Sequence, residues 1–252
     1  MNTPYQKAIA LASGHQEQNL GDINLALSEA MEHVAGHATG SSIKNINMLL
    51  IGGASLHATG FRKNFSDVDL LIETIELSTR MEQKMLVCKS SKMNVELFYD
   101  NKIGSLVDPE MFNRAIPIQN KEIGGVSVSV GLYPPEFFLL VKMEVGREKC
   151  QNDIQAMLQG IPLPSLLKAF NSIALHNEKW LMNDMADMLV TDLIMLYLPG
   201  KLHGESLSTL RQFCMDLDIE PDKKKELVMM CRHLEHSQKK PTPKASHEGL
   251  QP

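Results

Sequence analysis

The spacing of apolar positions differs between the two halves of the chain. In the first half, short apolar or alternating runs are bounded by turn residues, which is typical of strands. These runs predict strands at 45–51, 68–73, 93–99 and 126–130. From residue 135 to about residue 236 the pattern is typical of helices, with breaks at 160–164, 199–200 and 221.

Helices are also predicted in the first half. One is expected over 22–34, with Asp22 placed to cap its N-terminus. A short helix is expected at 54–59, after a Gly-Gly turn, and a longer one at 74–89. Pro135 suits the first turn of the helix that follows the fourth strand, because the N–H that proline lacks has no partner there.

This order of elements predicts an α+β fold, with a small mixed sheet and its helices followed by a helical C-terminal part. We expect an α/β domain over 1–160, including the N-terminal helix, and a helical domain over 161–237. Residues 238–252 hold three prolines and almost no apolar side chains, and this composition predicts a disordered tail.

Composition and charge narrow the choice of function. The 252 residues are 43% hydrophobic, which allows a sizeable core in one large domain or two small ones. The formal net charge of −5 gives no overall basic field for binding nucleic acid, although a local basic patch is compatible with it.

Other features indicate the compartment. The N-terminus lacks the basic region and apolar run of a signal peptide, and the apolar run at 188–198 is too short to cross a membrane. The four cysteines form no CxxC pair, which suits free thiols in a reducing compartment. We therefore expect a cytoplasmic protein with no membrane partner.

The clearest chemical signal is a pair of acids at the start of the second strand. Asp67 and Asp69 stand at alternate positions, so they point to the same face, while Val68 and Leu70 point to the other. Two adjacent acids on a partly buried strand repel each other unless a cation neutralises them. The cation that this pair suits is Mg²⁺, which is bound by one or two carboxylates together with substrate phosphates.

A glycine pair precedes these acids. Gly52 and Gly53 lie between a strand and a helix, where backbone N–H groups can approach an anion. Ser55 adds a hydroxyl that can donate to the same anion. Taken alone, the pair indicates only a tight turn, and its position before the two acids is what favours a phosphate site.

A third acid lies in the next strand. If the strand at 93–99 runs beside the Asp67 strand, Glu96 completes a set of three carboxylates. It then serves as a metal ligand or as the general base for an attacking hydroxyl. The alternative is a surface acid facing solvent, and Asp100, at the end of the strand, is the second candidate.

A lysine interrupts the apolar face of the helix that begins at Pro135. Lys142 either extends its ammonium group to solvent or projects into a cleft and neutralises nucleotide phosphates. Arg147 follows it, and Asp153 opens the next helix. Taken alone, Arg147 indicates a surface charge and Asp153 a helix cap.

These motifs together resemble the nucleotidyltransferase superfamily that shares the DNA polymerase beta-like fold. The resemblance covers roughly residues 45–158 and rests on the Gly-Gly turn, on Ser66-Asp67-Val68-Asp69 and on the acid of the next strand. The segment from Pro135 through Lys142 and Arg147 to Asp153 is similar to the branch of abortive-infection-type toxins of bacterial toxin–antitoxin systems.

The resemblance implies a role for each matching residue. Asp67 and Asp69 would bind Mg²⁺, in a site that can take two ions, and Glu96 would be the third acid. The triphosphate of an NTP would be held by residues around the glycine turn and the later helices, namely Gly52, Gly53, Ser55, Ser66, Lys142 and Asp153. The second glycine and the position of Ser66 depart from the commonest patterns, as Gly-Ser is more usual and the toxin branch places a basic residue before its first aspartate.

The implied activity is the transfer of a nucleoside monophosphate from an NTP to a hydroxyl acceptor. In the toxin branch that acceptor is RNA, such as a tRNA 3′ end, and a cognate antitoxin is expected as a partner. Small molecules and protein hydroxyls are further acceptor classes. The alternative is a non-catalytic module of the same fold, antitoxin-like or regulatory, that binds nucleotide or a partner.

Overall fold

The computed structural model describes residues 18–73, 75–81, 85–99, 107–146, 150–202 and 205–238. The fold is α+β, as the sequence predicts, and the chain divides into two compact units, Met1–Glu178 and Lys179–Pro252. The domain boundary expected between residues 160 and 161 falls inside the first unit, between two helices. The tail predicted over 238–252 lies outside the described residues, apart from the last residue of the final helix.

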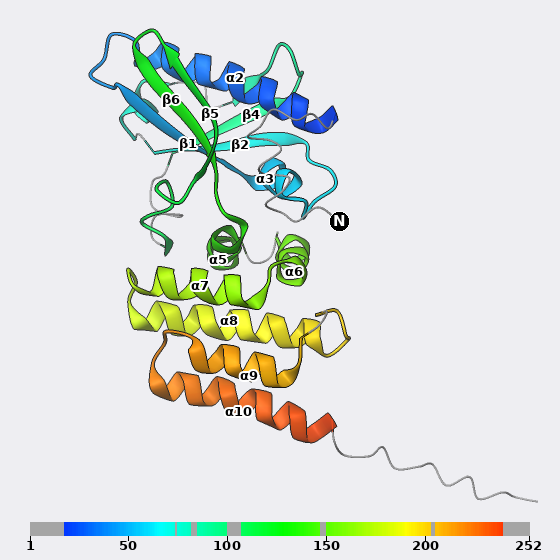
Figure 1. Ribbon diagram of the computed structural model, residues 1–252. Coiled ribbons are helices and arrows are strands. Elements are labelled where there is room, and N and C mark those ends of the chain that lie inside the picture. The colour runs from blue at the N-terminus through cyan, green and yellow to red at the C-terminus, as the bar shows by residue number, and fades with distance from the viewer. Residues whose placement is uncertain are drawn as a thin grey trace, which may run out of the picture. The chain divides into compact units, whose positions relative to one another are not determined.

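The first unit is built on a mixed sheet, six-stranded over the described residues, in the order β3-β4-β2-β1-β6-β5 (Figure 1). In the middle of the sheet, β1 pairs antiparallel with β2 and parallel with β6, and β2 pairs parallel with β4. The strands are β1 (Asn45–Ile51), β2 (Asp67–Ile72), β3 (Met85–Val87), β4 (Asn94–Tyr99), β5 (Ile116–Ile123) and β6 (Val126–Leu132). The four predicted strands are confirmed as β1, β2, β4 and β6.

The sequence did not indicate β5. This strand carries mostly polar residues after Pro117, and its pairing with β6 is irregular between Pro117 and Gln119. A proline and a bulge are tolerated because β5 lies at the edge of the sheet. Its apolar contribution to the core is small, so no alternation was there to be recognised.

The helix predicted over 74–89 is wrong. The described part of this segment holds a short 3₁₀ helix, η1 (Ile75–Thr79), and the edge strand β3. β3 forms a hairpin with β4, closed by hydrogen bonds from Cys88 N to Met93 O and from Lys92 N to Cys88 O (2.9 Å each), with Lys92 at a φ of 60°. Leu, Met, Glu and Lys favour a helix here, but pairing with β4 outweighs that weak local preference.

One face of the sheet is covered by α2 (Gln18–Ala38), and their apolar side chains form the core of the unit (Figure 1). The helix is longer than predicted, so Asp22 lies within it and does not cap it. The strands contribute alternate residues to this core, among them Leu50, Val68, Leu70, Val95, Leu97, Val128 and Val130.

The opposite face of the same strands carries the polar residues, together with buried apolar ones such as Leu49. Strand side chains alternate, so the residues between the core positions point away from α2. They include Asn47 on β1, Asp67 and Asp69 on β2, Glu96 on β4 and Ser129 on β6. The candidate chemistry therefore lies on the face that α2 leaves open.

Over its described residues, the first unit holds four further α-helices. The short helix after the Gly-Gly turn is confirmed as α3 (Gly52–Thr59), and the helix after the fourth strand begins at Pro135, as predicted. The remaining bounds are α5 (Pro135–Val145), α6 (Gln151–Gly160) and α7 (Leu163–Ala174). Both α6 and α7 pack against α5.

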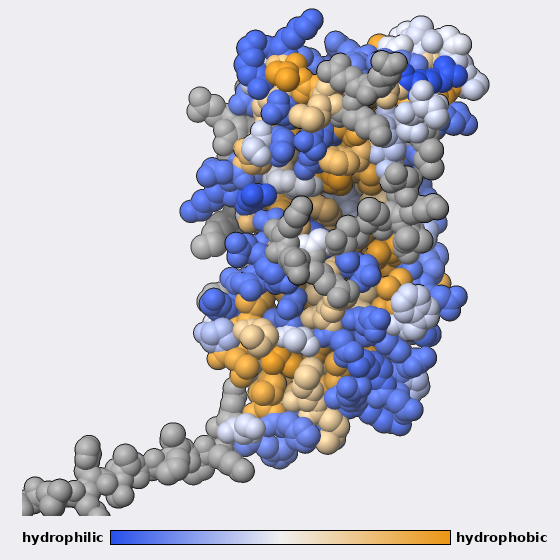
Figure 2. Space-filling model, turned by 180° about the vertical axis from the view of Figure 1, so that it is seen from behind, coloured by the Kyte–Doolittle hydropathy of each residue, from blue (hydrophilic) through white to orange (hydrophobic). Residues whose placement is uncertain are grey.

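The second unit consists of helices α8 (Lys179–Tyr197), α9 (Leu207–Asp216) and α10 (Pro221–Gln238). Cys214 and Cys231 pack against each other in its core with 3.9 Å between their sulfur atoms, and the chain's four cysteines are free thiols. Apolar side chains also reach the surface of the C-terminal helices (Figure 2). The exposed ones are Trp180, Met195, Leu198, Met215 and Met229.

Across the described residues, none of the helices combines the length and the apolar character that crossing a bilayer requires.

Candidate active site

Three carboxylates gather on the open face of the sheet. β4 lies directly beside β2, and the parallel register places Glu96 next to Asp69. Asp67 is two residues before Asp69 on the same strand and therefore shares its face. The side chains of all three residues are partly buried. This is the arrangement that is required if Glu96 is to complete a set of three carboxylates with Asp67 and Asp69.

Asp69 is the most perturbed of the three acids. Burial, together with the negative charges of Asp67 and Glu96, raises its pKa from the ordinary 3.8 to about 6. Lys142 acts in the opposite sense. The carboxylates are thus close enough to repel one another, and the charge of Lys142 is close enough to lower the pKa of Asp69. The site therefore favours an added positive charge.

Gly52 lies against the Asp69 carboxylate. Ile51, the residue before it, pairs with Asp69 across β1 and β2. Gly52 has a φ of 66°, and a Cβ atom placed on it would come within 1.8 Å of Asp69 Oδ2. Only glycine fits this position, because any side chain would have to occupy the space of the carboxylate.

Gly52 also begins α3, so the first-turn N–H groups of this helix open toward the acids. Ile51 precedes the helix and offers no side-chain acceptor to these N–H groups. Uncapped N–H groups and the helix dipole together favour a negatively charged ligand. An anion bound there would stand beside the carboxylates, where a cation could neutralise both.

Arg62 was not placed in the site by the sequence. The chain reverses at Gly60, whose φ is 87°, and the N–H groups of Phe61 and Arg62 donate to Leu56 O. The reversal returns Arg62 to the start of α3, where a Cβ atom on Gly53 would lie 3.1 Å from its NH1 atom. The guanidinium group therefore lies beside the uncapped N–H groups. A glycine directly after the predicted helix at 54–59 is the signal that would have predicted the reversal.

Lys142 points into this region and pairs with Asp153. Its Nζ atom lies 3.4 Å from Asp153 Oδ2 and 3.2 Å from Cys150 Sγ, and its side chain is 12% exposed. Arg62 NH1 reaches the same carboxylate oxygen at 3.9 Å. This burial beside Asp153 rules out the interpretation in which Lys142 extends its ammonium group to solvent. Asp153 thus holds two cations at the edge of the acidic cluster.

Two predicted residues occupy other places. Ser66 donates a hydrogen bond to Asp67 Oδ1 (3.0 Å), so its hydroxyl orients a carboxylate. Ser55 is 1% exposed within α3, and this placement gives no support to a direct contact with a triphosphate. Asp100 and Arg147 lie outside the described residues.

The donor set suits a hard cation that also binds its substrate. Among the described residues, no group of three or more His, Cys, Asp or Glu side chains is gathered closely enough to hold a metal ion by itself. Mg²⁺ does not require one, because it binds to one or two carboxylates and takes its other ligands from phosphates and water. Asp67 and Asp69 offer carboxylate oxygens on one face, and a cation would offset both the burial and the repulsion that raise the pKa of Asp69.

No protein-family model matches the chain, and a search of curated proteins finds no significant match.

Proposed function

We propose that this protein is a Mg²⁺-dependent nucleotidyltransferase, which moves a nucleoside monophosphate from an NTP to a hydroxyl acceptor. The observation that carries the proposal is the contact of Gly52 with Asp69, because it joins an uncapped helix N-terminus to a carboxylate cluster. A triphosphate fits this combination, because its oxygens accept hydrogen bonds from N–H donors and also bind a cation.

Each side chain has a role in binding. The first-turn N–H groups of α3 and the Arg62 guanidinium hold the β- and γ-phosphates. Lys142 neutralises the phosphate next to the acids, and Asp153 holds its ammonium group in place. Asp67 and Asp69 would hold the Mg²⁺, and Ser66 orients Asp67. When bound, Mg²⁺ neutralises the charge on the transferred phosphoryl group.

The chemical step is an in-line displacement at the α-phosphorus. The acceptor oxygen forms a new bond to that phosphorus, while the bond to the oxygen bridging the β-phosphate breaks. Pyrophosphate leaves with the electron pair of the broken bond. Glu96, beside Asp69, takes the proton of the attacking hydroxyl.

The acceptor that the resemblance implies is the 3′ end of an RNA such as a tRNA, with the protein acting as the toxin of a toxin–antitoxin pair. The net charge of −5 agrees with an RNA acceptor that is bound only at one end. Binding along the length of an RNA would require a basic surface to contact its phosphates.

The test is transfer of label from α-³²P-labelled NTPs to total cellular RNA in the presence of Mg²⁺. We expect labelling by the wild type and a loss of roughly a hundredfold or more in Asp69→Asn and Glu96→Gln, since both remove a charged group at the reacting centre. Glu122→Gln is the matched control, because Glu122 is an exposed strand acid on β5, away from β2 and β4.

Labelling that is absent from the wild type with every NTP and acceptor, while nucleotide still binds, would replace the proposal with the non-catalytic binding module. Equal labelling by the wild type and by Asp69→Asn would also contradict it, because it would assign the activity to a contaminant or to another site.

A further inference from the structure

A groove lies on the same open face of the sheet as the three acids, over β1, β6 and β5. Its volume is about 240 Å³. Asn47 pairs in register with Ser129, and Ser129 pairs with Asn120, so their side chains share one face. Phe112 and Ala115, from the loop before β5, form a wall of the groove. The polar part of the lining is therefore two amides and a hydroxyl, and an aromatic ring and apolar residues such as Leu49 and Pro117 make up the rest.

Asn47 is exposed but held on both sides. Its Nδ2 atom donates to Glu73 Oε2 (2.6 Å), and its Oδ1 atom accepts from Ser129 Oγ (2.6 Å). A side-chain amide has two N–H groups and two acceptor lone pairs. One of each is used in these two bonds, which leaves one N–H group and one acceptor lone pair of the amide for a ligand. Asn47 also lines the groove, so an adjacent donor and acceptor are available there.

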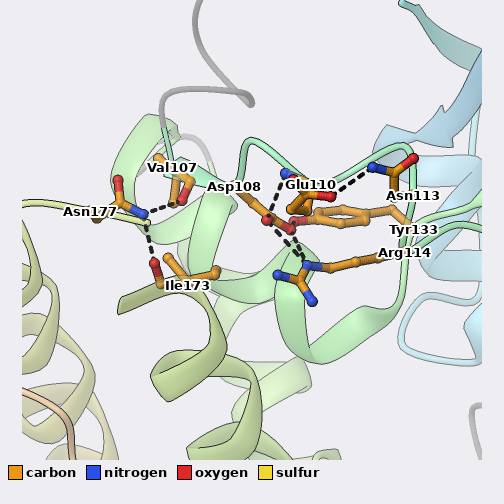
Figure 3. A network of polar contacts seen from close by, with 8 residues as sticks. All are labelled: Val107, Asp108, Glu110, Asn113, Arg114, Tyr133, Ile173 and Asn177. Atoms are coloured by element: carbon orange, nitrogen blue, oxygen red, sulfur yellow. Dashed lines mark hydrogen bonds and ion pairs between the residues drawn. The ribbon is translucent and has the colours of Figure 1, made fainter. Parts of the chain in front are cut away.

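A buried ion pair fixes the loop that carries Phe112. Asp108 is fully buried and accepts hydrogen bonds from Arg114 Nε (3.0 and 3.2 Å) and from the Tyr133 hydroxyl (2.6 Å), as Figure 3 shows. The Asn177 amide donates to Val107 O at the start of the loop (2.8 Å; Figure 3). The wall of the groove is therefore anchored on both sides of Phe112.

A nucleobase matches this lining. Its flat face stacks on an aromatic ring, and its edge carries donors and acceptors side by side. An asparagine amide forms a paired donor–acceptor contact most favourably with adenine. The groove also lies within reach of a nucleotide bound at the acids. Ile51, which pairs with Asp69, is four positions after Asn47 on β1, roughly 13 Å along the strand.

We propose that the groove around Asn47 is a nucleobase subsite with a preference for adenine. The inference rests on the proposed nucleotidyl transfer, and it adds the chemical class of one substrate group. Two sources of adenine are compatible with it: the base of the incoming NTP and the last base of the acceptor. The KM values of ATP and of acceptors ending in adenosine separate these sources.

The first experiment measures adenosine binding by ligand-observed NMR, without Mg²⁺ or phosphate. We expect the wild type to bind adenosine more tightly than cytidine, and Asn47→Ala and Asn120→Ala each to weaken adenosine binding about tenfold, the usual effect of losing a paired base contact. Asn45→Ala is the matched control, because Asn45 is exposed on the same face of β1 but does not line the groove. Thermal denaturation of each variant confirms that it is folded.

The second experiment is kinetic. If Asn47→Ala raises the KM of ATP and not of the other NTPs, the subsite takes the base of the NTP. If the variant raises the KM only of acceptors ending in adenosine, the subsite takes the acceptor base. Transfer with unchanged KM values in Asn47→Ala and Asn120→Ala overturns the subsite and leaves the proposed function standing. Specific adenosine binding by a wild type that transfers nothing supports the subsite and contradicts the proposed function. A wild type that binds adenosine no better than cytidine overturns the subsite.

Discussion

At the scale of single residues, Gly52 and Asp69 occupy one small space. The left-handed backbone at Gly52 turns its α-carbon toward the carboxylate, and the absence of a side chain lets the two meet. A glycine that only formed the turn between β1 and α3 would not have to contact Asp69. The pairing therefore ties the shape of the turn to the position of an acid that the proposed reaction uses.

Gly52→Ala should abolish transfer and lower the free energy of unfolding by clearly more than Gly40→Ala. Both glycines have a positive φ, 66° and 77°, but a Cβ atom on Gly40 meets nothing within 4 Å. Gly40→Ala therefore reports backbone strain alone, about 1–2 kcal/mol. The added loss in Gly52→Ala comes from displacing Asp69. Urea denaturation of both variants measures the difference, and equal losses would mean that the contact with Asp69 is not tight.

The raised pKa of Asp69 makes a prediction about stability and pH. The folded state binds the proton with a pKa of about 6 and the unfolded state with one near 3.8. Because the folded state holds the proton more tightly, this contribution to stability is present below pH 4 and is lost as the pH rises through 6. Asparagine resembles the protonated carboxyl at every pH.

Without divalent ions, Asp69→Asn should therefore melt a few degrees above the wild type at pH 8 and close to it at pH 4. The effect corresponds to about 1 kcal/mol once partial solvent exposure of the carboxylate is allowed for. Added Mg²⁺ should raise the melting temperature of the wild type at pH 8 and leave the variant unchanged. A variant that melts below the wild type at pH 8 in EDTA would show that the three carboxylates do not repel one another.

At the scale of elements, the start of the helix that carries Lys142 is held by a buried cluster of Asp108, Arg114 and Tyr133, called the clasp below. Tyr133 ends the segment before α5 and bonds Asp108, while Arg114 pairs with Asp108 and lies 4.5 Å from the centre of the Phe137 ring on α5. Burial and the negative charge of Asp108 raise the pKa of the Tyr133 hydroxyl, so it remains a donor. The clasp thus connects α5 with the loop that walls the groove.

Tyr133→Phe should lower the free energy of unfolding by about 1–3 kcal/mol, because a buried carboxylate loses a hydrogen bond. Asp108→Ala should cost more, about 3–5 kcal/mol, since it leaves both Arg114 and the Tyr133 hydroxyl without their acceptor. Urea denaturation measures both. A smaller loss in Asp108→Ala than in Tyr133→Phe would show that Asp108 is not the centre of the clasp.

The same scale explains what the sequence can and cannot predict. β1, β2, β4 and β6 are recognisable because each places apolar residues in the core, and the alternation along β2 is enough to put Asp67 and Asp69 on one face. β3 and β5 are edge strands: the three residues of β3, Met85-Leu86-Val87, suit an apolar helix face as well as a strand, and β5 is mostly polar after Pro117. Pairing, and not local preference, decides them.

Two residues of the site depend on the same long-range information. Arg62 reaches α3 only through the reversal at Gly60, and Asn47 meets Ser129 only because β1 and β6 are neighbours in one register. Gly60 could have predicted that the chain reverses, but neither the return of Arg62 to Gly53 nor the pairing of Asn47 with Ser129 is encoded in the adjacent residues. A glycine turn and two alternating acids are local patterns, and they are the part of the site that could be predicted.

At the scale of the whole molecule, the chemistry and the core belong to one unit. The residues proposed to bind or react lie between Asn47 and Asp153, and the main apolar cluster runs from Leu20 to Leu132. Both ranges fall within Met1–Glu178. A domain of this size buries enough of its surface to be stable by itself.

A chain ending at Glu178 should therefore fold cooperatively and bind an NTP with Mg²⁺ within about threefold of the full-length affinity, a difference below 1 kcal/mol. The physical reason is that binding uses α3, β2, β4, α5 and α6, and none of these belongs to the second unit. Urea denaturation and equilibrium dialysis test the two parts of the prediction separately. Asp69→Asn in the shortened chain is the control for Mg²⁺-dependent binding. A shortened chain that folds but binds no nucleotide would show that residues after Glu178 contribute to the nucleotide site.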